Sequence, residues 1–251
     1  RGMYNFPKIL LLHQLTQQPM GVPMDAAEWP ESWKKVEFKE YPRMPKALLP
    51  APLPLASTVQ ETLLRRASMR NFHPKNVLSS TQLSTLLYWG AGLNTERTVQ
   101  GCLESSVRFY PSGGARYTLE VYLYFRGNPD IEEGVYHYNV KEHHLEQLSA
   151  GAESGRAVRA LPTYPWAYDA PLFFFFTSVF DRAMRKYKER GYRFAALEAG
   201  ALLHNFYLVS AALGISCCSL GSAFDQQAET ILDLDGVHEG FLTALVVGLP
   251  A

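Results

Sequence analysis

The spacing of apolar residues predicts two helices and two buried strands as the clearest elements of the chain. After Ser57–Thr58, the stretch TVQETLLRRASMR has a helical period behind a capping residue. A second helix is predicted from Ser79–Ser80 through TQLSTLLYWGAG, closed by glycine. The runs PLFFFFTSVF (171–180) and FLTALVVGL (241–249) have strand length and are apolar throughout. Such runs are typical of strands buried on both faces.

Residues 194–213, FAALEAGALLHNFYLVSAAL, are apolar around most of a helical circumference. This predicts a long buried central helix that ends at Gly214. Residues 117–125 have the composition of a strand, and 134–139 with 143–148 indicate a hairpin. Helices and strands mix without strict βαβ alternation. The sequence therefore predicts an α+β fold with a mostly antiparallel central sheet flanked by helices.

The first 56 residues differ in pattern from the rest. Four prolines between Pro45 and Pro54 exclude a regular helix there and predict an extended, proline-rich arm. A disordered leader is the alternative, but the arm's aromatic residues favour packing on a surface; they are Trp29, Trp33, Phe38 and Tyr41. We therefore expect an N-terminal arm, 1–56, and one folded domain, 57–251.

Composition narrows the class of protein. The 251 residues are 47% hydrophobic, and 24 Lys and Arg balance 24 Asp and Glu. A net charge of zero does not favour a nucleic-acid or membrane binder, which needs a basic excess. The three cysteines, Cys102, Cys217 and Cys218, have no metal-ligand spacing and indicate reduced thiols in the cytoplasm. The apolar run 9–12 is too short to span a membrane.

Arg66, Ser68 and Arg70 alternate where the first predicted helix ends. If the backbone is extended there, residues spaced by two share one side. Two guanidinium groups and a hydroxyl on one side suit a phosphate. A solvated basic face near a helix C-terminus is the alternative.

Two glycine-containing segments raise a similar question. In RFYPSGGARYTLEVYLYF (108–125), Gly113 and Gly114 let a ligand approach the main chain, or simply make a turn before a strand. In SCCSLGSAFD (216–225), Gly221 and Ser222 offer backbone donors near a helix start, or only connect two elements. The Walker pattern and GxGxxG are absent.

DRAMRKYKERGYR (181–193) places Lys186 beside Tyr187. Such a pair can transfer protons when burial lowers the lysine pKa, although most runs of this kind are solvated helix faces. His143 and His144 have no third ligand at metal spacing, so we expect no metal site. His204, within the apolar helix, is more typical of a structural core residue.

The motifs, in order, resemble the flavin-dependent nitroreductase superfamily, and within it the SagB-type azoline dehydrogenases that mature peptides. RRASMRNF resembles the superfamily's R-x-S-x-R-x-F motif, and RFYPSGGARYTLEVYLY resembles the branch's YPSGGALYPIEVY-like signature. HQLT, FKEYPRMPKALLP, LSSTQLSTLLYWGAGL, KYKERGYRFAALEAG and the closing GSAFDQQAETILDLDG fall in the expected order, so the resemblance covers roughly 10–250.

The resemblance implies a nitroreductase-like fold, and a homodimer with FMN at the subunit interface. It implies phosphate and side-chain contacts from Arg66, Ser68 and Arg70. Pro111, Ser112 and Gly113 would form the loop at the flavin ring, typically from the partner subunit, and Gly221 and Ser222 would donate backbone N–H groups near the ring. Lys186 and Tyr187 match a pair implicated in dehydrogenation.

The implied activity is FMN-dependent oxidation of thiazoline or oxazoline rings in a ribosomally synthesised peptide, with a cyclodehydratase as partner. The alternatives are an NAD(P)H-dependent nitro or quinone reductase, and a non-catalytic binding module on the same scaffold. The chain departs from the branch pattern at Ala201, where histidine is common, at His204–Asn205, at Arg116 and at Thr118.

Overall fold

The computed structural model describes residues 7–17, 28–35, 37–73, 75–97 and 107–251. Its helices are α1 (Pro7–Leu15), α2 (Glu31–Lys34), α3 (Val59–Arg65), α4 (Ser80–Ala91), α5 (Ala152–Arg159), α6 (Asp181–Tyr187), α7 (Gly191–Leu213) and α8 (Asp225–Ile231). Its strands are β1 (Lys46–Leu48), β2 (Leu119–Phe125), β3 (Gly134–Asn139), β4 (His144–Ala150), β5 (Leu172–Val179), β6 (Ser216–Leu220) and β7 (Glu239–Gly248). Short 3₁₀ turns span Gly113–Ala115, Pro165–Ala167 and Lys188–Arg190.

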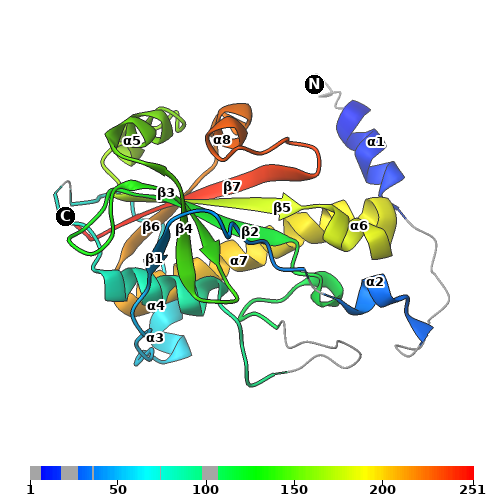
Figure 1. Cartoon of the computed structure of the whole chain (residues 1–251), viewed down its shortest axis with the longest axis horizontal. Coiled ribbons are helices and arrows are strands. Elements are labelled where there is room, and N and C mark those ends of the chain that lie inside the picture. Colours follow the sequence, from blue (N-terminus) through cyan, green and yellow to red (C-terminus); the bar gives the residue numbers. More distant parts are fainter. Residues whose placement is uncertain (1–6, 18–27, 36, 74, 98–106) are drawn as a thin grey trace.

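The strands form one sheet in the order β1-β4-β3-β2-β5-β7-β6 (Figure 1). Every pairing in this order is antiparallel. The phenylalanine-rich strand β5 lies between β2 and β7, so both of its edges are hydrogen-bonded. Its central position explains why the sequence 172–176 is apolar without alternation, because both faces are covered.

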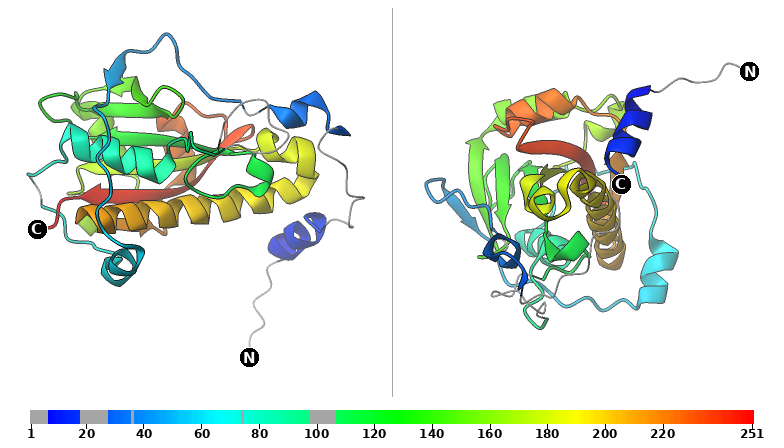
Figure 2. Two further views of the ribbon diagram at one scale, coloured as in Figure 1. Left: turned by 90° about the horizontal axis from the view of Figure 1, so that it is seen from below. Right: turned by 90° about the vertical axis from the view of Figure 1, so that its right-hand side faces the viewer.

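The two faces of β5 serve two separate cores. Phe174 and Phe176 pack with Phe206 of α7, at ring-centroid distances of 4.8 and 5.2 Å. Phe173 and Phe175 face the other core, which includes residues of α5 and α8. Figures 1 and 2 show α4 and α7 on one side of the sheet and α5 and α8 on the other. The predicted α+β fold, with its antiparallel sheet and long central helix, is confirmed.

Helix α7 ends as the sequence predicts, because Gly214 adopts a left-handed conformation with φ of 67°. Among the described residues, 181–213 is the one helical stretch long and apolar enough to cross a membrane by length and composition. Its buried residues include Leu202 and Phe206, which are fully buried against the sheet and α4. The stretch is the core helix of this fold.

Helix α3 is shorter than the predicted helical stretch. A capping box between Thr58 and Glu61 begins it, and it ends at Arg65. The chain then runs extended along β6, where the Met69 N–H donates to the Cys217 carbonyl oxygen at 2.9 Å. The tertiary contact with β6 therefore stops the helix and creates the two-residue spacing that puts Arg66, Ser68 and Arg70 on one side.

The N-terminal segment contains α1 and α2 as well as the proline-rich stretch. Within it, β1 pairs with β4 at the edge of the sheet, and Trp29, Trp33, Phe38 and Tyr41 are half-buried. The division of the chain between residues 56 and 57 stays a prediction. Cys217 and Cys218 are buried free thiols, and Cys102 lies outside the described residues.

Candidate functional site

The glycine loop, residues 111–115, is closely packed against α6 and α7 of its own chain. Gly114 has a φ of 62°, a left-handed conformation that favours glycine. The phenol oxygen of Tyr187 occupies the space that a Cβ at position 114 would need. A Cβ on Gly113 would meet the Phe194 ring at 3.0 Å. Gly114 is therefore required by a side chain of this chain, and Gly113 is tightly packed, whether or not a ligand also approaches.

The hydroxyl of Ser112 holds this loop in place. It donates to the Glu198 carboxylate at 2.6 Å and accepts from the Tyr117 N–H at 2.8 Å. Glu198 also accepts from the Thr118 hydroxyl and the Leu119 N–H. Burial raises the pKa of Glu198, and the hydrogen bond from Ser112 opposes that rise. Because the Ser112 side chain is used inside the protein, its contribution to a ligand would come from the main chain.

Lys186 and Tyr187 lie at the end of α6, and the Tyr187 phenol meets the glycine loop. The Tyr187 ring packs edge-to-face on Phe194 at 4.7 Å. Burial raises the pKa of the Tyr187 phenol, and the positive charge of Arg116 opposes this. The structure thus brings the predicted Lys-Tyr pair and the predicted flavin-ring loop together, although 72 to 76 residues of sequence separate Tyr187 from 111–115.

The predicted phosphate-binding residues form a second group near the C-terminal half of α7. The Ser68 hydroxyl lies 3.3 Å from the Tyr207 phenol oxygen, which itself accepts from the Ser219 N–H at 2.7 Å. The Arg66 guanidinium lies 5.8 Å from the centre of the Tyr207 ring. Tyr207 therefore connects the extended segment 66–70 to β6.

Gly221 and Ser222 directly follow β6, the strand along which segment 66–70 runs. A Cβ on Gly221 would lie 3.8 Å from the Tyr164 phenol oxygen, an ordinary van der Waals contact, so the fold tolerates a side chain there. Tyr164 stacks on Trp166 at 5.5 Å, and the Arg70 guanidinium lies 5.7 Å from the Trp166 ring centre. The second group thus consists of segment 66–70, residues 221–222 and the rings of Tyr164 and Trp166.

This donor set fits the phosphate end of FMN. Arg70 and Ser68 are exposed and Arg66 is half-buried, so two guanidinium groups and a hydroxyl can reach an anion. The glycine loop lies elsewhere: Phe194, which contacts it, and Tyr207 are about 20 Å apart along α7 at about 1.5 Å per residue. One chain therefore presents the two predicted halves of a flavin site at different ends of one helix.

Reasoning from the sequence missed several residues of these groups. Glu198 fixes the glycine loop, Tyr207 joins Ser68 to β6, and Trp166 contacts Arg70. The sequence offered a weak signal for Glu198, a carboxylate in an otherwise apolar helix. Tyr207 and Trp166 carry no local signal, because aromatic residues are also ordinary core residues.

The histidines singled out in the sequence have separate places. His204 is exposed. The ring of His143 contacts the Ser84 hydroxyl at 2.9 Å and the Tyr138 phenol at 2.8 Å, and burial lowers its pKa to about 4. Among the described residues no group of three or more His, Cys, Asp or Glu could hold a metal ion.

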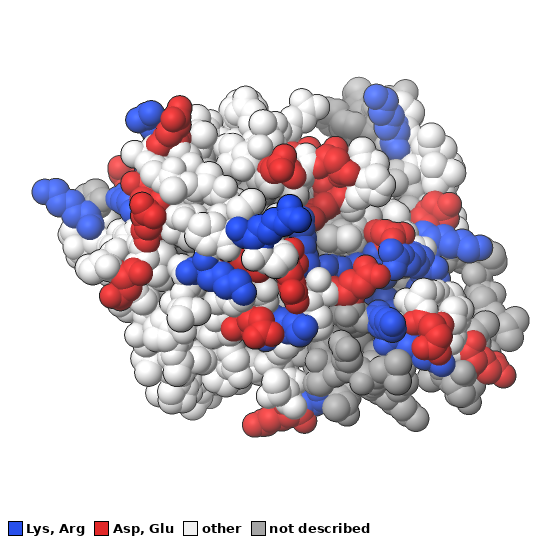
Figure 3. All heavy atoms as spheres, viewed as in Figure 1, with Lys and Arg blue, Asp and Glu red and all other residues white. Residues whose placement is uncertain are grey.

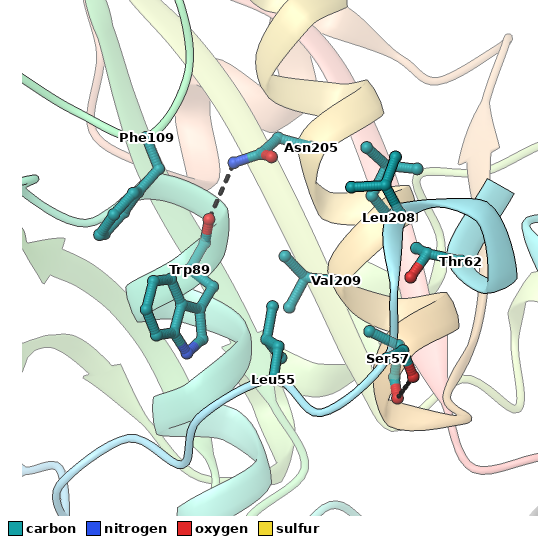
Figure 4. Close-up of a pocket in the computed structure, with 10 residues that line it drawn as sticks. Leu55, Ser57, Thr62, Trp89, Phe109, Asn205, Leu208 and Val209 are labelled. Atoms are coloured by element: carbon teal, nitrogen blue, oxygen red, sulfur yellow. Dashed lines mark hydrogen bonds between the residues drawn. The ribbon is translucent and has the colours of Figure 1, made fainter.

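Asn205 serves a structural role at an apolar cavity of about 250 Å³ between α3, α4 and α7 (Figure 4). Its side-chain amide donates to the carbonyl oxygens of Trp89 and Gly90, both at 2.8 Å. These are carbonyls of the last turn of α4, which α-helical hydrogen bonds leave unpaired. Asn205 therefore caps α4 and ties it to α7.

A buried ionic network anchors α6. His137 faces Glu120 through Nε2 at 2.9 Å and Glu146 through Nδ1 at 2.8 Å. Since each ring nitrogen meets an acceptor, both carry a proton and the ring is an imidazolium. Glu120 in turn pairs with Arg182 of α6 at 2.5 Å, and Arg182 donates to the Tyr117 carbonyl oxygen at 3.1 Å. Arg182 lies one helical turn before Lys186, so the network fixes the helix that carries the Lys-Tyr pair.

Burial alone would raise the pKa of Glu120, but the charge of Arg182 and the hydrogen bond from His137 lower it to about 2. For His137, burial opposes the charged form, and the hydrogen bonds to Glu120 and Glu146 outweigh it and raise its pKa. Both shifts favour the charged forms of Glu120 and His137.

The chain matches one family model and is similar to known proteins that process peptides. Residues 63–249 match the nitroreductase family. The trifolitoxin-processing protein TfxB of Rhizobium leguminosarum bv. trifolii is 31% identical over 212 residues, which are 81% of this chain and 56% of TfxB. The microcin B17-processing protein McbC of Escherichia coli is 28% identical over 181 residues, 66% of this chain and 60% of McbC. The chain thus spans somewhat more than half the length of these two relatives.

A solved structure extends the likeness to the fold. It is the E. coli microcin synthetase McbBCD complex with truncated pro-MccB17 bound. The similar chain has a TM-score of 0.61 and 22% identity, and the match covers 98% of this chain and 94% of that one.

Proposed function

This chain belongs to the nitroreductase family and is an oxidoreductase, and we propose that it uses FMN to dehydrogenate thiazoline or oxazoline rings in a ribosomally synthesised peptide. The family predicted from the motifs is confirmed, and the peptide-processing relatives TfxB and McbC agree with the SagB-type branch. The substrate is our proposal.

One observation carries it: the Tyr187 phenol oxygen lies against the backbone of Gly114. The Lys186–Tyr187 pair, which the resemblance links to dehydrogenation, is thus beside the loop that the resemblance assigns to the flavin ring. A pair next to a flavin ring is placed to handle the α-proton of an azoline.

Each group of residues has a role in this proposal. Arg66, Ser68 and Arg70 would hold the phosphate, and the main chain of 111–113 and of Gly221 and Ser222 would border the ring. Bound FMN supplies the acceptor for the hydride that leaves the ring next to the α-carbon. Lys186 or Tyr187 would act on the proton. Arg182, one helical turn earlier in α6, and the glycine loop next to Tyr187 fix the position of the pair.

A homodimer would bring the two halves of the site together. Helix α7 exposes an apolar strip beside the glycine loop, in which Leu197 is 70% exposed and Ala196 and Gly200 are also exposed. Pairing through this strip buries apolar surface. It also allows the glycine loop of one subunit to face segment 66–70 of the other. Within a single chain these two segments lie apart.

The further partners follow from the same relatives. We propose that the protein works on a peptide together with a cyclodehydratase, as the McbBCD complex with its bound peptide supports. We place it in the cytoplasm. Lys, Arg, Asp and Glu are interspersed on the face shown in Figure 3, and the net charge is zero. This charge distribution favours a peptide over a nucleic acid as the partner.

The test uses the purified full chain with an azoline-containing peptide. We expect a yellow protein whose visible spectrum is that of FMN, and azole formation that K186A and Y187F reduce at least about 100-fold while FMN stays bound. A colourless protein that takes up no FMN, or K186A and Y187F variants that both keep the wild-type rate, would refute the proposal. Rapid anaerobic bleaching by NADPH, with no azole formed, would instead favour the NAD(P)H-dependent reductase.

A further inference from the structure

The N-terminal segment covers Lys186 with two indole rings. The Lys186 ammonium nitrogen lies 3.4 Å from the ring centre of Trp29 and 5.4 Å from that of Trp33. The Tyr187 ring contributes a third face at 5.5 Å. A cation within about 6 Å of an aromatic face is attracted by the ring, and tryptophan is the strongest partner. Three rings around one ammonium form an aromatic cage.

Arg116 holds this cage onto the site. Its side chain is 3% exposed. Its Nε donates to the Gly114 carbonyl oxygen at 3.0 Å, and its Nη1 donates to the carbonyl oxygen of Trp33. One rigid guanidinium group thus joins the glycine loop to α2. Helix α2 lies beside α6, where Lys186 is located (Figure 1).

We propose that Trp29 and Trp33 keep Lys186 as an ammonium group and that Arg116 is the positioning residue that holds them there. The inference rests on the proposed function for its meaning: Lys186 would be the charged member of the catalytic pair, and it would not accept a proton while the indoles cover it.

The physical basis is the preference of an indole face for the cation over the neutral amine. A neutral amine would lose this attraction and keep only the apolar contact. Leucine in place of Trp29 retains bulk without the π face, whereas phenylalanine retains a π face. These two substitutions separate charge stabilisation from simple coverage.

The experiment is competitive labelling of lysines by a trace of acetic anhydride, which acylates only the neutral amine, followed by peptide mass spectrometry. The exposed Lys46 and Lys75 are internal references. At one mildly alkaline pH we expect Lys186 to label about 2- to 30-fold faster in W29L than in the wild type. W29F should stay close to the wild type, and W29A should be at least as fast as W29L.

The Arg116 variants test the positioning role. R116Q should speed labelling of Lys186 in the same direction as W29L, and R116K should do so less. W33L, at a half-buried position, gives the same readout should the R116Q protein unfold. If Lys186 is labelled at the wild-type rate in W29L and faster only in W29A, the indole merely covers the amine. That result would overturn the proposal. Unchanged labelling of Lys186 in a folded R116Q protein would show that Arg116 does not hold the indole rings in place.

Labelling needs neither FMN nor peptide, so the two proposals fail separately. Fast labelling in W29L combined with normal azole formation by the K186A and Y187F variants would uphold the cage and refute the dehydrogenase assignment. Loss of azole formation in K186A, combined with unchanged labelling of Lys186 in W29L, would uphold the dehydrogenase assignment and refute the cage.

Discussion

The Tyr187 phenol oxygen fills the space beside Gly114 that any other residue's Cβ would occupy. This contact joins the end of α6 to the loop before β2, two segments that carry separate sequence motifs. It also explains the glycine in physical terms, because Gly114 has both a positive φ and a neighbour in the way.

The first prediction concerns that contact. G114A should lower the free energy of unfolding by about 2–3 kcal/mol, since alanine meets both backbone strain and the Tyr187 oxygen. Urea unfolding measures it. G151A is the matched control: its φ is 86°, yet nothing lies within 4 Å of its Cβ position. Equal losses in G114A and G151A would show that Tyr187 does not press on the loop.

The second prediction concerns the arginine pair. R66A and R70A should each weaken FMN binding about 10- to 100-fold, because each removes a charge-assisted hydrogen-bond donor to the phosphate. Quenching of FMN fluorescence measures the dissociation constant. R65A, an exposed arginine outside the alternating set, should leave it unchanged. Wild-type affinity in both variants would move the phosphate site away from segment 66–70.

The third prediction concerns pH. The folded-state pKa of His137 is raised, so its stabilisation is full below about 6.5 and is lost as pH rises through the folded pKa. Glu120 and Glu146 have folded pKa values of about 2, so their stabilisation is present above about 4.3 and is lost as pH falls toward 2. Unfolding free energy should therefore fall on both sides of neutrality.

The variant that checks this is H137Q. It leaves buried carboxylates without a cation and should cost about 3–5 kcal/mol at neutral pH while flattening the alkaline fall. Urea unfolding from acid to alkaline pH gives both quantities. H238Q, which breaks an exposed ion pair with Asp235, should leave the free energy of unfolding nearly unchanged. An alkaline fall that persists unchanged in H137Q would assign it to another group.

The fourth prediction concerns the proposed dimer. L197E places a charge in the exposed apolar strip of α7 and should convert dimer to monomer with loss of FMN. Sedimentation velocity and the visible spectrum report the two effects. V237E, at a position that is 72% exposed and outside α7, should remain a yellow dimer. A wild-type dimer in L197E would place the subunit interface elsewhere.

The sequence by itself determined the class of several main elements and the family of the protein, but not strand β6 (Ser216–Leu220), which lies in a segment that its small residues predict to be a connection. The buried strand at 172–179, the long helix ending at Gly214 and the capped helices at 59 and 80 follow from local periods, caps and composition. The family followed from short contiguous motifs around Arg66, Gly113 and Lys186. These signals are local, because the chemistry of a turn or cap lies within a few residues.

Only the tertiary structure decided which of these residues meet. Ser112 bonds to Glu198, Ser68 to Tyr207, and Arg116 to the Trp33 carbonyl oxygen. None of these pairs is close in sequence, and their contact depends on how α6 and α7 pack on the sheet and how the N-terminal segment crosses them. Local propensity contains no information on such packing, since a buried tyrosine or glutamate looks the same in the sequence whichever loop it holds.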